Sequence, residues 1–352
     1  MTEKETFDLF VPADNIDGIR PHVLRWSERE PPVKVIEVDD LNRAAADIVV
    51  GEGDLIACDA KWLMENPQPG LNVIGALERR EPTMVLVGND KLEYVPKNAI
   101  IITELPLLKR QLLRARSDLV IKTPTEIAKD TGSELPEEYI SCLQWLNEQI
   151  ENGNIDGFIT TRSNYSAASI RTRRHTLGMQ RGDASRQRFV PPPWQGYTMI
   201  LARPKFPIQC LLEYLDEGNY RSFQLESVLV AGIPPQHQDF IGVNISQRKV
   251  ATILKEMLDK SEQQLSHELV DINGDIISGK PRIEVVLELV GVNGSSTVSI
   301  ERVAPMDEAT TVMIRKMLVE WEHLMDVTVT ENPDHPRYGP ACPPFITLDE
   351  EE

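Results

Sequence analysis

The sequence is poor in cysteine and has no long apolar run. Its four cysteines, at positions 58, 142, 210 and 342, lie far apart and form no CxxC pair and no zinc-type spacing. This distribution is typical of free thiols in a reducing compartment. No stretch approaches the roughly 18 consecutive apolar residues that a membrane-spanning helix needs. The charged first five residues lack the apolar segment of a secretory signal. We therefore expect a cytoplasmic protein with no metal site and no membrane span.

Common catalytic motifs are also missing. The sequence contains no HExxH, no phosphate-binding loop with its Gly-Lys-Ser/Thr ending, no GxSxG and no GxGxxG. These absences exclude the zinc peptidases, nucleotide hydrolases, α/β-hydrolases and dinucleotide enzymes that depend on those motifs. The six histidines are scattered and show no metal-ligand spacing.

Positive charge is scarce overall but concentrated in one place. The chain has 37 Lys and Arg against 55 Asp and Glu, a net charge of −18, which argues against nucleic-acid binding by the whole surface. Residues 162–188, here called the arginine island, contain a single acid, Asp183. The island comprises Arg162, Arg171, Arg173, Arg174, Arg181, Arg186 and Arg188.

Two interpretations of the arginine island stay open. It could bind an anionic small molecule, an RNA backbone or a protein partner. It could instead be a loop that pairs with the chain's own acids, such as Glu213, Asp216 and Glu217. The only aromatic residues within or beside the island are Tyr165 and Phe189, so stacking on nucleic-acid bases has little support.

The hydrophobic pattern predicts several domains. A length of 352 residues is typical of two or three. Strand and helix patterns alternate over residues 7–87 and again over 99–202, which favours sheets covered by helices. The last unit differs: strands are predicted at 266–272, 282–292 and 297–303, with Asn-Gly turns at 273–274 and 293–294. A helix beginning at Asp307 should follow this antiparallel meander.

Residues 53–87 carry the clearest family resemblance. They contain Gly-Asp-Leu-Ile-Ala-Cys-Asp-Ala-Lys-Trp-Leu, then Pro-Gly-Leu at 69–71, then Arg-Arg-Glu-Pro-Thr from Arg79. This resembles hydroxymethylbilane synthase (porphobilinogen deaminase), in which a strand enters His-Ser-x-Lys-Asp, followed by Pro-x-Gly-Leu and Arg-x-x-Pro-x-Asp. Residues 95–112, 194–203 and 226–243 are similar to later family segments in the same order.

The resemblance implies a fold. Two doubly wound α/β domains would be joined by two crossing strands, as in the type-2 periplasmic-binding-protein-like architecture. A small C-terminal α+β domain would carry a three-stranded antiparallel sheet. We expect domain 1 at 1–97 and 190–215, domain 2 at 98–189 and domain 3 at 216–330. Residues 331–352 would form an acidic, proline-rich tail.

The residues that the family uses for catalysis are replaced. The family's acid aligns with Trp62, and the cysteine that anchors its dipyrromethane cofactor aligns with His237. Imidazole cannot form the required thioether, so we expect no cofactor. The family's paired arginines align with Leu107 and Leu108. Asp59, which replaces a family serine, is a weak candidate for a compensating acid.

Some residues could still bind a ligand. The candidates are Lys61, Lys109, Arg110 and Arg203, together with Arg171, Arg173 and Arg174 of the arginine island. Lys109 and Arg110 follow the replaced arginines, but a two-residue shift on a helix turns a side chain by about 200°. Trp62 and Trp194 could meet in the cleft and stack on a flat ligand.

Three functional hypotheses follow. The first is a non-catalytic or repurposed member of the hydroxymethylbilane synthase fold that binds an anionic ligand or a macromolecular partner. The second is a divergent enzyme of tetrapyrrole biosynthesis that polymerises porphobilinogen. The third is a generic two-domain anion-binding protein that shares only the architecture. Whether the chain is an enzyme stays open at this point.

Overall fold

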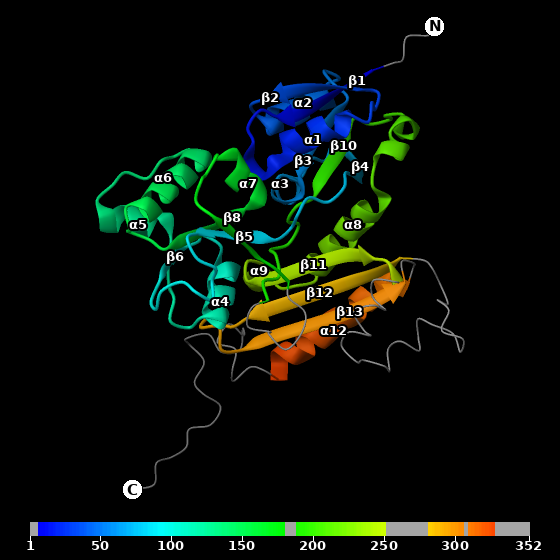
Figure 1. Ribbon diagram of the computed structural model, residues 1–352. Coiled ribbons are helices and arrows are strands. Elements are labelled where there is room, and N and C mark those ends of the chain that lie inside the picture. Colours follow the sequence, from blue (N-terminus) through cyan, green and yellow to red (C-terminus); the bar gives the residue numbers. More distant parts are fainter. Residues whose placement is uncertain (1–5, 180–187, 251–280, 306–308, 328–352) are drawn as a thin grey trace.

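The computed structural model describes residues 6–179, 188–250, 281–305 and 309–327. In these residues the chain forms two five-stranded mixed sheets and one three-stranded antiparallel sheet (Figure 1). Each sheet and its helices define one domain, and the three domains meet around the middle of the molecule. The fold class expected from the sequence is thereby confirmed.

Domain 1 is built on a sheet with strand order β2-β1-β3-β10-β4. The strands are β1 (Phe7–Pro12), β2 (Val33–Val38), β3 (Leu55–Asp59), β4 (Asn72–Ala76) and β10 (Thr198–Ala202). The helices are η1 (Ile16–Gly18), α1 (Ile19–Ser27), α2 (Leu41–Val49) and α3 (Ala60–Glu65). β1 runs parallel to β2 and β3, whereas β10 is antiparallel to both of its neighbours.

Domain 2 repeats this arrangement with strand order β7-β6-β8-β5-β9. The strands are β5 (Met84–Gly88), β6 (Ile100–Ile102), β7 (Val120–Lys122), β8 (Gly157–Thr161) and β9 (Arg174–Leu177). The helices are α4 (Pro106–Ala115), α5 (Pro124–Thr131), α6 (Tyr139–Glu151) and α7 (Arg162–Ala167). β6 is parallel to β7 and β8, and β5 is antiparallel to β8 and β9.

In both sheets the fourth strand is the one that crosses from the other domain. β5 follows β4 in the chain but pairs in the second sheet, and β10 follows β9 but pairs in the first. The two predicted crossing strands are therefore present. β5 lies within residues 1–97, which we had expected to belong to domain 1. Its pairing with β8 places it in domain 2.

Domain 3 consists of a meander with a helix layer. Its sheet has the order β11 (Ile241–Arg248), β12 (Arg282–Val290), β13 (Thr297–Pro305). The helices are α8 (Glu217–Ala231), the short α9 (Pro235–Gln238) and α12 (Ala309–Val327). Side chains from α8, α12 and the sheet form one buried apolar cluster around Trp321.

The first strand of this meander differs from the predicted one. β11 occupies the edge position next to β12, whereas the sequence pattern had favoured residues 266–272. That segment, its Asn-Gly turn, Asp307 and the tail from 331 lie outside the described residues. The predicted turn at 293–294 is confirmed by a positive φ of 75° at Gly294, between β12 and β13.

Three elements of domain 2 were not predicted: α5, α7 and β9. Helix α5 begins with a capping box in which Thr123 and Glu126 bond to each other's backbone, with Pro124 in the first turn. This pattern is a recognisable helix start. Helix α7 spans only six residues, so its hydrophobic periodicity is too short to be seen.

Two adjacent arginines fix the crossing segments. Arg79 contacts Glu226 of α8 at 3.7 Å, donates to the Gln195 and Ile245 carbonyls, and lies 3.9 Å from the centre of the Tyr197 ring. Arg80 bonds Asp59 at the end of β3. The backbone of Arg80 also bonds that of Gly196, where any side chain would clash with the Arg80 carbonyl.

We predict that Glu226→Ala lowers the free energy of unfolding by about 3 kcal/mol, because it strands a buried guanidinium. Glu226 is fully buried and also accepts hydrogen bonds from the Trp194 backbone N–H and the Tyr197 hydroxyl. Urea unfolding measures the change. On the same helix Val228 is exposed, so Val228→Ala should cost less than about 0.5 kcal/mol. Equal effects of the two substitutions would show that Glu226 does not secure the crossing segments.

Candidate functional site

A cavity of about 1060 Å³ lies where the three domains meet. Its walls include Asp17, Lys61 and Glu104, which follow β1, β3 and β6, and Thr161, the last residue of β8. These are carboxyl ends of parallel strands, where open α/β sheets bind ligands. The second crossing segment and domain 3 complete the cavity with Pro192, Pro193, Trp194, Gln195, Ser227, Val230, Ala231, Gln238 and Asp239.

The domain 1 wall is formed by Asp17 and Lys61. Asp59 caps α3 by accepting from the Lys61 N–H at 2.9 Å, which places Lys61 in the first turn of that helix. The Lys61 ammonium pairs with Glu65 one helical turn later, at 3.7 Å. Asp17 is the central residue of η1, the short 3-10 turn after β1, and has a left-handed backbone with φ 55°.

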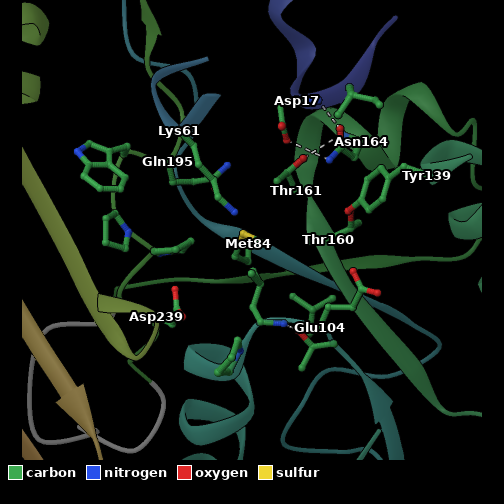
Figure 2. Close-up of a pocket in the computed structure, with 18 of the residues that line it drawn as sticks. Asp17, Lys61, Met84, Glu104, Tyr139, Thr160, Thr161, Asn164, Gln195 and Asp239 are labelled. Atoms are coloured by element: carbon green, nitrogen blue, oxygen red, sulfur yellow. Dashed lines mark hydrogen bonds between the residues drawn. The ribbon is translucent and has the colours of Figure 1, made fainter. Parts of the chain in front are cut away.

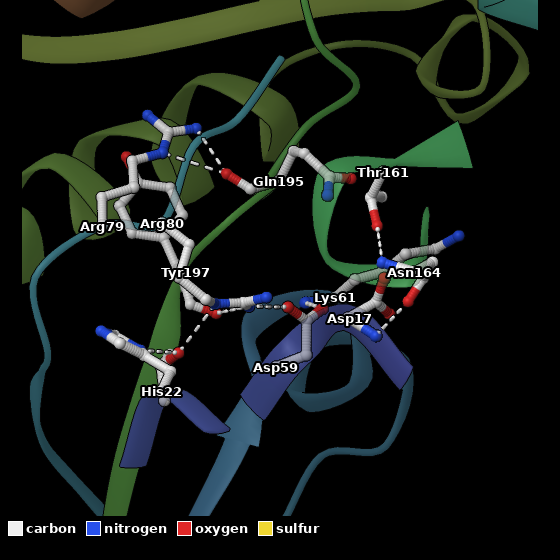
Figure 3. A network of polar contacts seen from close by, with 11 residues as sticks. Asp17, His22, Asp59, Lys61, Arg79, Arg80, Thr161, Asn164, Gln195 and Tyr197 are labelled. Atoms are coloured by element: carbon white, nitrogen blue, oxygen red, sulfur yellow. Dashed lines mark hydrogen bonds and ion pairs between the residues drawn. The ribbon is translucent and has the colours of Figure 1, made fainter. Parts of the chain in front are cut away.

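Asp59 is bonded to Arg80 of the first crossing segment and is not among the residues that line the cavity. Its carboxylate lies 3.0 Å from the Arg80 guanidinium (Figure 3). The same guanidinium also donates to the Thr198 hydroxyl. Burial raises the pKa of Asp59 to about 6 and outweighs the opposing effect of Arg80. His22 bonds Thr198 from the other side, and burial lowers its pKa to about 4. None of Asp59, Arg80 and His22 is among the residues that line the cavity.

The domain 2 wall carries Glu104, Tyr139 and two threonines. Thr161 caps α7 by accepting from the Asn164 N–H at 3.0 Å. The neighbouring Thr160 is 1% exposed. Burial raises the pKa of Tyr139, and the carboxylates of Asp17 and Glu104 raise it further. Acids from two domains thus lie near one phenol (Figure 2).

The cleft between domains 1 and 2 is closed by a pair of hydrogen bonds. The Asp17 N–H donates to the Asn164 side-chain oxygen at 2.6 Å, and the Asn164 amide donates to the Asp17 carboxylate at 3.1 Å. Beside this contact, Gly18 lies so close to Ser163 that a β-carbon would approach its hydroxyl to 2.7 Å. We call Asp17, Gly18, Ser163 and Asn164 the clasp.

The cavity is acidic. Its lining residues include five carboxylates and one ammonium, which belongs to Lys61 and is already paired. The carboxylates are Asp17, Glu65, Glu104, Glu137 and Asp239. Such a charge balance repels anions. The described residues contain no group of three His, Cys, Asp or Glu that could hold a metal ion.

The other ligand-binding candidates lie away from this cavity. Lys109 is exposed on α4, and Arg110 is buried against domain 3, over the Phe240 ring and bonded to the Val290 carbonyl. Arg203 pairs with Asp54 at 2.7 Å. That pair lies beyond the start of β3, whereas the cavity lies beyond its end.

The two tryptophans named from the sequence have different positions. Trp194 lines the cavity and donates its indole N–H to Ser227 at 3.2 Å. Trp62 packs against the apolar cluster of domain 1 that Trp194 also contacts, and it is not among the lining residues. Only Trp194 is therefore placed to contact a ligand.

The described arginines of the arginine island do not share one surface. Arg162 begins α7 at the cavity end of the second sheet. Arg174 on β9 lies opposite Val87 in the sheet, near the other end of β5. Val87 is roughly 10 Å along that strand from Met84, which lines the cavity. Arg171 and Arg173 are exposed close to it. Arg188 instead pairs with Glu288 and Glu301 of domain 3.

The resemblance aligned His237 with the family's cofactor-anchoring cysteine. His237 is 2% exposed within α9, although the next two residues, Gln238 and Asp239, line the cavity. Among the described cysteines only Cys142, on α6, lines it. Burial raises the pKa of Cys142, and Glu104 raises it further, so the thiol is not activated as a nucleophile.

Most cavity residues were missed from the sequence. Several of them lie at the ends of predicted strands or just after them, so their place at a sheet edge could have been inferred. These are Asp17, Glu104, Thr160 and Asn164. Nothing in the linear order indicates that Asp17 and Asn164, 147 positions apart, bond each other. Tyr139 begins α6 and belongs to no motif that marks a site residue.

No family model and no curated protein sequence matches the chain. Solved structures with a similar arrangement include three binding proteins or lipoproteins. A nutrient-binding protein from Burkholderia cenocepacia bound to methionine is 13% identical, covers 59% of this chain and 91% of its own, and has a TM-score of 0.34. Lipoprotein Tp32 from Treponema pallidum is 12% identical, with coverage of 64% and 96% and a TM-score of 0.35.

The third is the periplasmic aliphatic sulphonate-binding protein SsuA from Escherichia coli. It is 12% identical, with coverage of 99% of this chain and 96% of its own and a TM-score of 0.32. At such scores the assignment of the fold rests on the strand order of the chain itself. Within the described residues no helix is long and apolar enough to span a bilayer.

We predict that Asn164→Ala opens the clasp, because two hydrogen bonds between domains 1 and 2 are lost. Hydrogen exchange followed by mass spectrometry should show at least tenfold faster exchange in peptides that cover Asp17 and Asn164. Asn66→Ala is the matched control, since Asn66 bonds only within its own domain, to the Trp62 carbonyl. Unchanged exchange in the clasp would show that it does not hold the cleft closed.

Asp59 should impose a pH dependence on stability. Its folded-state pKa of about 6 lies above its ordinary value of 3.8, so its protonated form favours folding. That contribution is complete below pH 4 and is lost as the pH rises through 6, a change of about 3 kcal/mol. The stability of the native chain relative to Asp59→Asn should therefore fall between pH 4.5 and 7.5 in urea unfolding. A rise over this range would mean that Arg80 outweighs burial.

Proposed function

We propose that this chain is a non-catalytic member of the hydroxymethylbilane synthase fold that binds a small molecule in the cavity among its three domains. The observation that carries the proposal is the cavity itself. It combines the carboxyl ends of strands from both sheets with a clasp that closes over them. A volume near 1000 Å³ is suited to a small ligand.

The replaced catalytic positions support the absence of the parent reaction. Trp62 stands for the acid and packs into the domain 1 core, so it cannot stabilise charge on a pyrrole. His237 stands for the cofactor cysteine and is buried. Cys142 comes from a different domain, and its raised pKa leaves it protonated at neutral pH.

The cavity charge also argues against the parent substrate. Porphobilinogen carries acetate and propionate groups, which a cationic site would hold by bidentate pairing. Here Leu107 and Leu108 stand for the family's paired arginines, and both are buried. The lining residues offer five carboxylates instead, and only one cation. The same balance disfavours the anionic ligand that the sequence had suggested.

We predict that the full chain neither consumes porphobilinogen nor gains mass from it. The assay follows the free substrate and the intact-protein mass in one tube, with an active hydroxymethylbilane synthase as the positive control. Substrate loss is expected in the control alone. A covalent mass increase on this chain, together with substrate loss, would establish the divergent enzyme and sink the non-catalytic proposal.

A further inference from the structure

Several carboxylates of the cavity have no cationic partner. Among the described residues, no ion pair or hydrogen bond engages the side chain of Glu104 or of Asp239. Asp17 accepts one hydrogen bond, from Asn164. The single lysine of the lining is paired with Glu65. Arg80 is paired with Asp59, and the Asp17 carboxylate also acts on the Arg80 guanidinium, opposing the lowering of its pKa by burial. The charges of Glu104 and Asp239, and part of the charge of Asp17, are therefore left for a ligand to neutralise.

Two of these acids, Asp17 of domain 1 and Glu104 of domain 2, lie near the same phenol, that of Tyr139. Asp17 follows β1 and Glu104 follows β6, which are equivalent strands in the shared order of the two sheets. Both carboxylates lie close enough to the Tyr139 hydroxyl to raise its pKa. Figure 2 draws Asp17 and Glu104 on different sides of the space that Tyr139 faces.

A buried hydroxyl provides an independent indication of a ligand. Thr160 lines this cavity and is 1% exposed, and among the described residues its hydroxyl has only one polar neighbour, the Tyr139 phenol, with no hydrogen bond of normal geometry between them. Because a hydroxyl offers one donor and two acceptor lone pairs, this contact leaves acceptor capacity that a ligand could use. Buried polar groups without a partner are rare in folded proteins, and a bound donor would satisfy this one.

The ligand charge is better carried by an organic group than by a metal ion. Metal ions need several ligand atoms within about 2–2.6 Å of one point. The described acids form no such group of three. A cavity of about 1060 Å³, lined also by Met84, Leu143 and Trp194, has room for an apolar body behind a charged head.

We propose that the cavity binds an organic cation, with its ammonium or guanidinium group between the carboxylates of Asp17 and Glu104 and a hydrogen-bond donor directed at Thr160. This rests on the proposed binding function and names its ligand class. Charge-assisted hydrogen bonds from such a group to both domains would favour the closed clasp.

The test uses matched probes that differ in the sign of their charge. Isothermal titration of the full chain at pH 7.5 and low salt compares tryptamine with indole-3-acetate, and cadaverine with glutarate. At least one cation should bind one equivalent, at least tenfold more tightly than its anionic counterpart. Glu104→Gln should weaken that binding about tenfold. Glu93→Gln, which removes the same charge from an exposed site outside the cavity, should not.

A variant that blocks the cavity shows which proposal is wrong: the one that the ligand is a cation, or the one that the cavity binds a ligand at all. Ala231 is an exposed residue on the cavity wall, so Ala231→Trp should fill the cavity without disturbing a core. Cation binding that is lost in Ala231→Trp supports both proposals. Anion binding that is lost in Ala231→Trp overturns the cation and leaves the binding function intact. No binding, or binding that Ala231→Trp does not change, overturns both.

Cys142 offers a second measurement that does not depend on ligand identity. Its thiol lines the cavity near Glu104, whereas Cys210 lies in domain 1 away from it. A cationic methanethiosulfonate reagent should modify Cys142 at least tenfold faster than an anionic one, relative to the same ratio at Cys210. Glu104→Gln should reduce this preference. An equal or inverted ratio at Cys142 would contradict a cation-attracting cavity.

Discussion

The structure depends on buried ion pairs at the point where the chain crosses between domains. Arg79 and Arg80 are adjacent, so their side chains leave the crossing segment in different directions. One contacts Glu226 of domain 3, and the other contacts Asp59 of domain 1. A buried guanidinium that loses its acidic partner is costly, so removal of either acidic side chain should be destabilising, even though burial raises the pKa of both acids. Two consecutive residues thereby fix the positions of all three domains around one cavity.

The same arrangement explains why the cavity is acidic. Each arginine of the first crossing segment is paired with a carboxylate. The interface between domains 2 and 3 follows the same rule, since Arg114 bonds Glu288 at 3.0 Å and Arg188 bonds Glu301. Arg110 is also engaged there, with the Val290 carbonyl and the Phe240 ring. Arginines that a sequence comparison would place at a ligand therefore serve domain contacts, and the carboxylates at the strand ends stay uncompensated.

Much of the fold could be predicted because it follows local patterns. Alternating strands and helices, the order of family-like segments and the Asn-Gly turn before β13 each depend on short stretches of sequence. The first strand of domain 3 was misplaced, because β11 and residues 266–272 are both apolar enough to fill an edge position. The short α7 and the edge strand β9 carry too few residues for a visible period.

The site was harder to predict because it depends on distance in space. The helical rotation that was expected to turn Arg110 away from the cleft is consistent with its burial against domain 3. The clustering of arginines over 162–188 is a property of the linear chain, and its described members lie at different places in the fold: Arg162 begins α7, Arg174 lies on β9 and Arg188 contacts domain 3. Lys61 was identified because it matches the lysine of the His-Ser-x-Lys-Asp pattern that its segment resembles. Asp17, Glu104 and Tyr139 have no such motif, and only the packing of two domains brings them together.

The central claim is that the cavity holds a reversible ligand and no covalent pyrrole. Mass spectrometry of the purified full chain, under native and then denaturing conditions, tests it most directly. We expect a native mass that exceeds the sequence mass by one small cation, and a denatured mass equal to that of the sequence. An added mass that survives denaturation and corresponds to a pyrrole adduct would contradict the account.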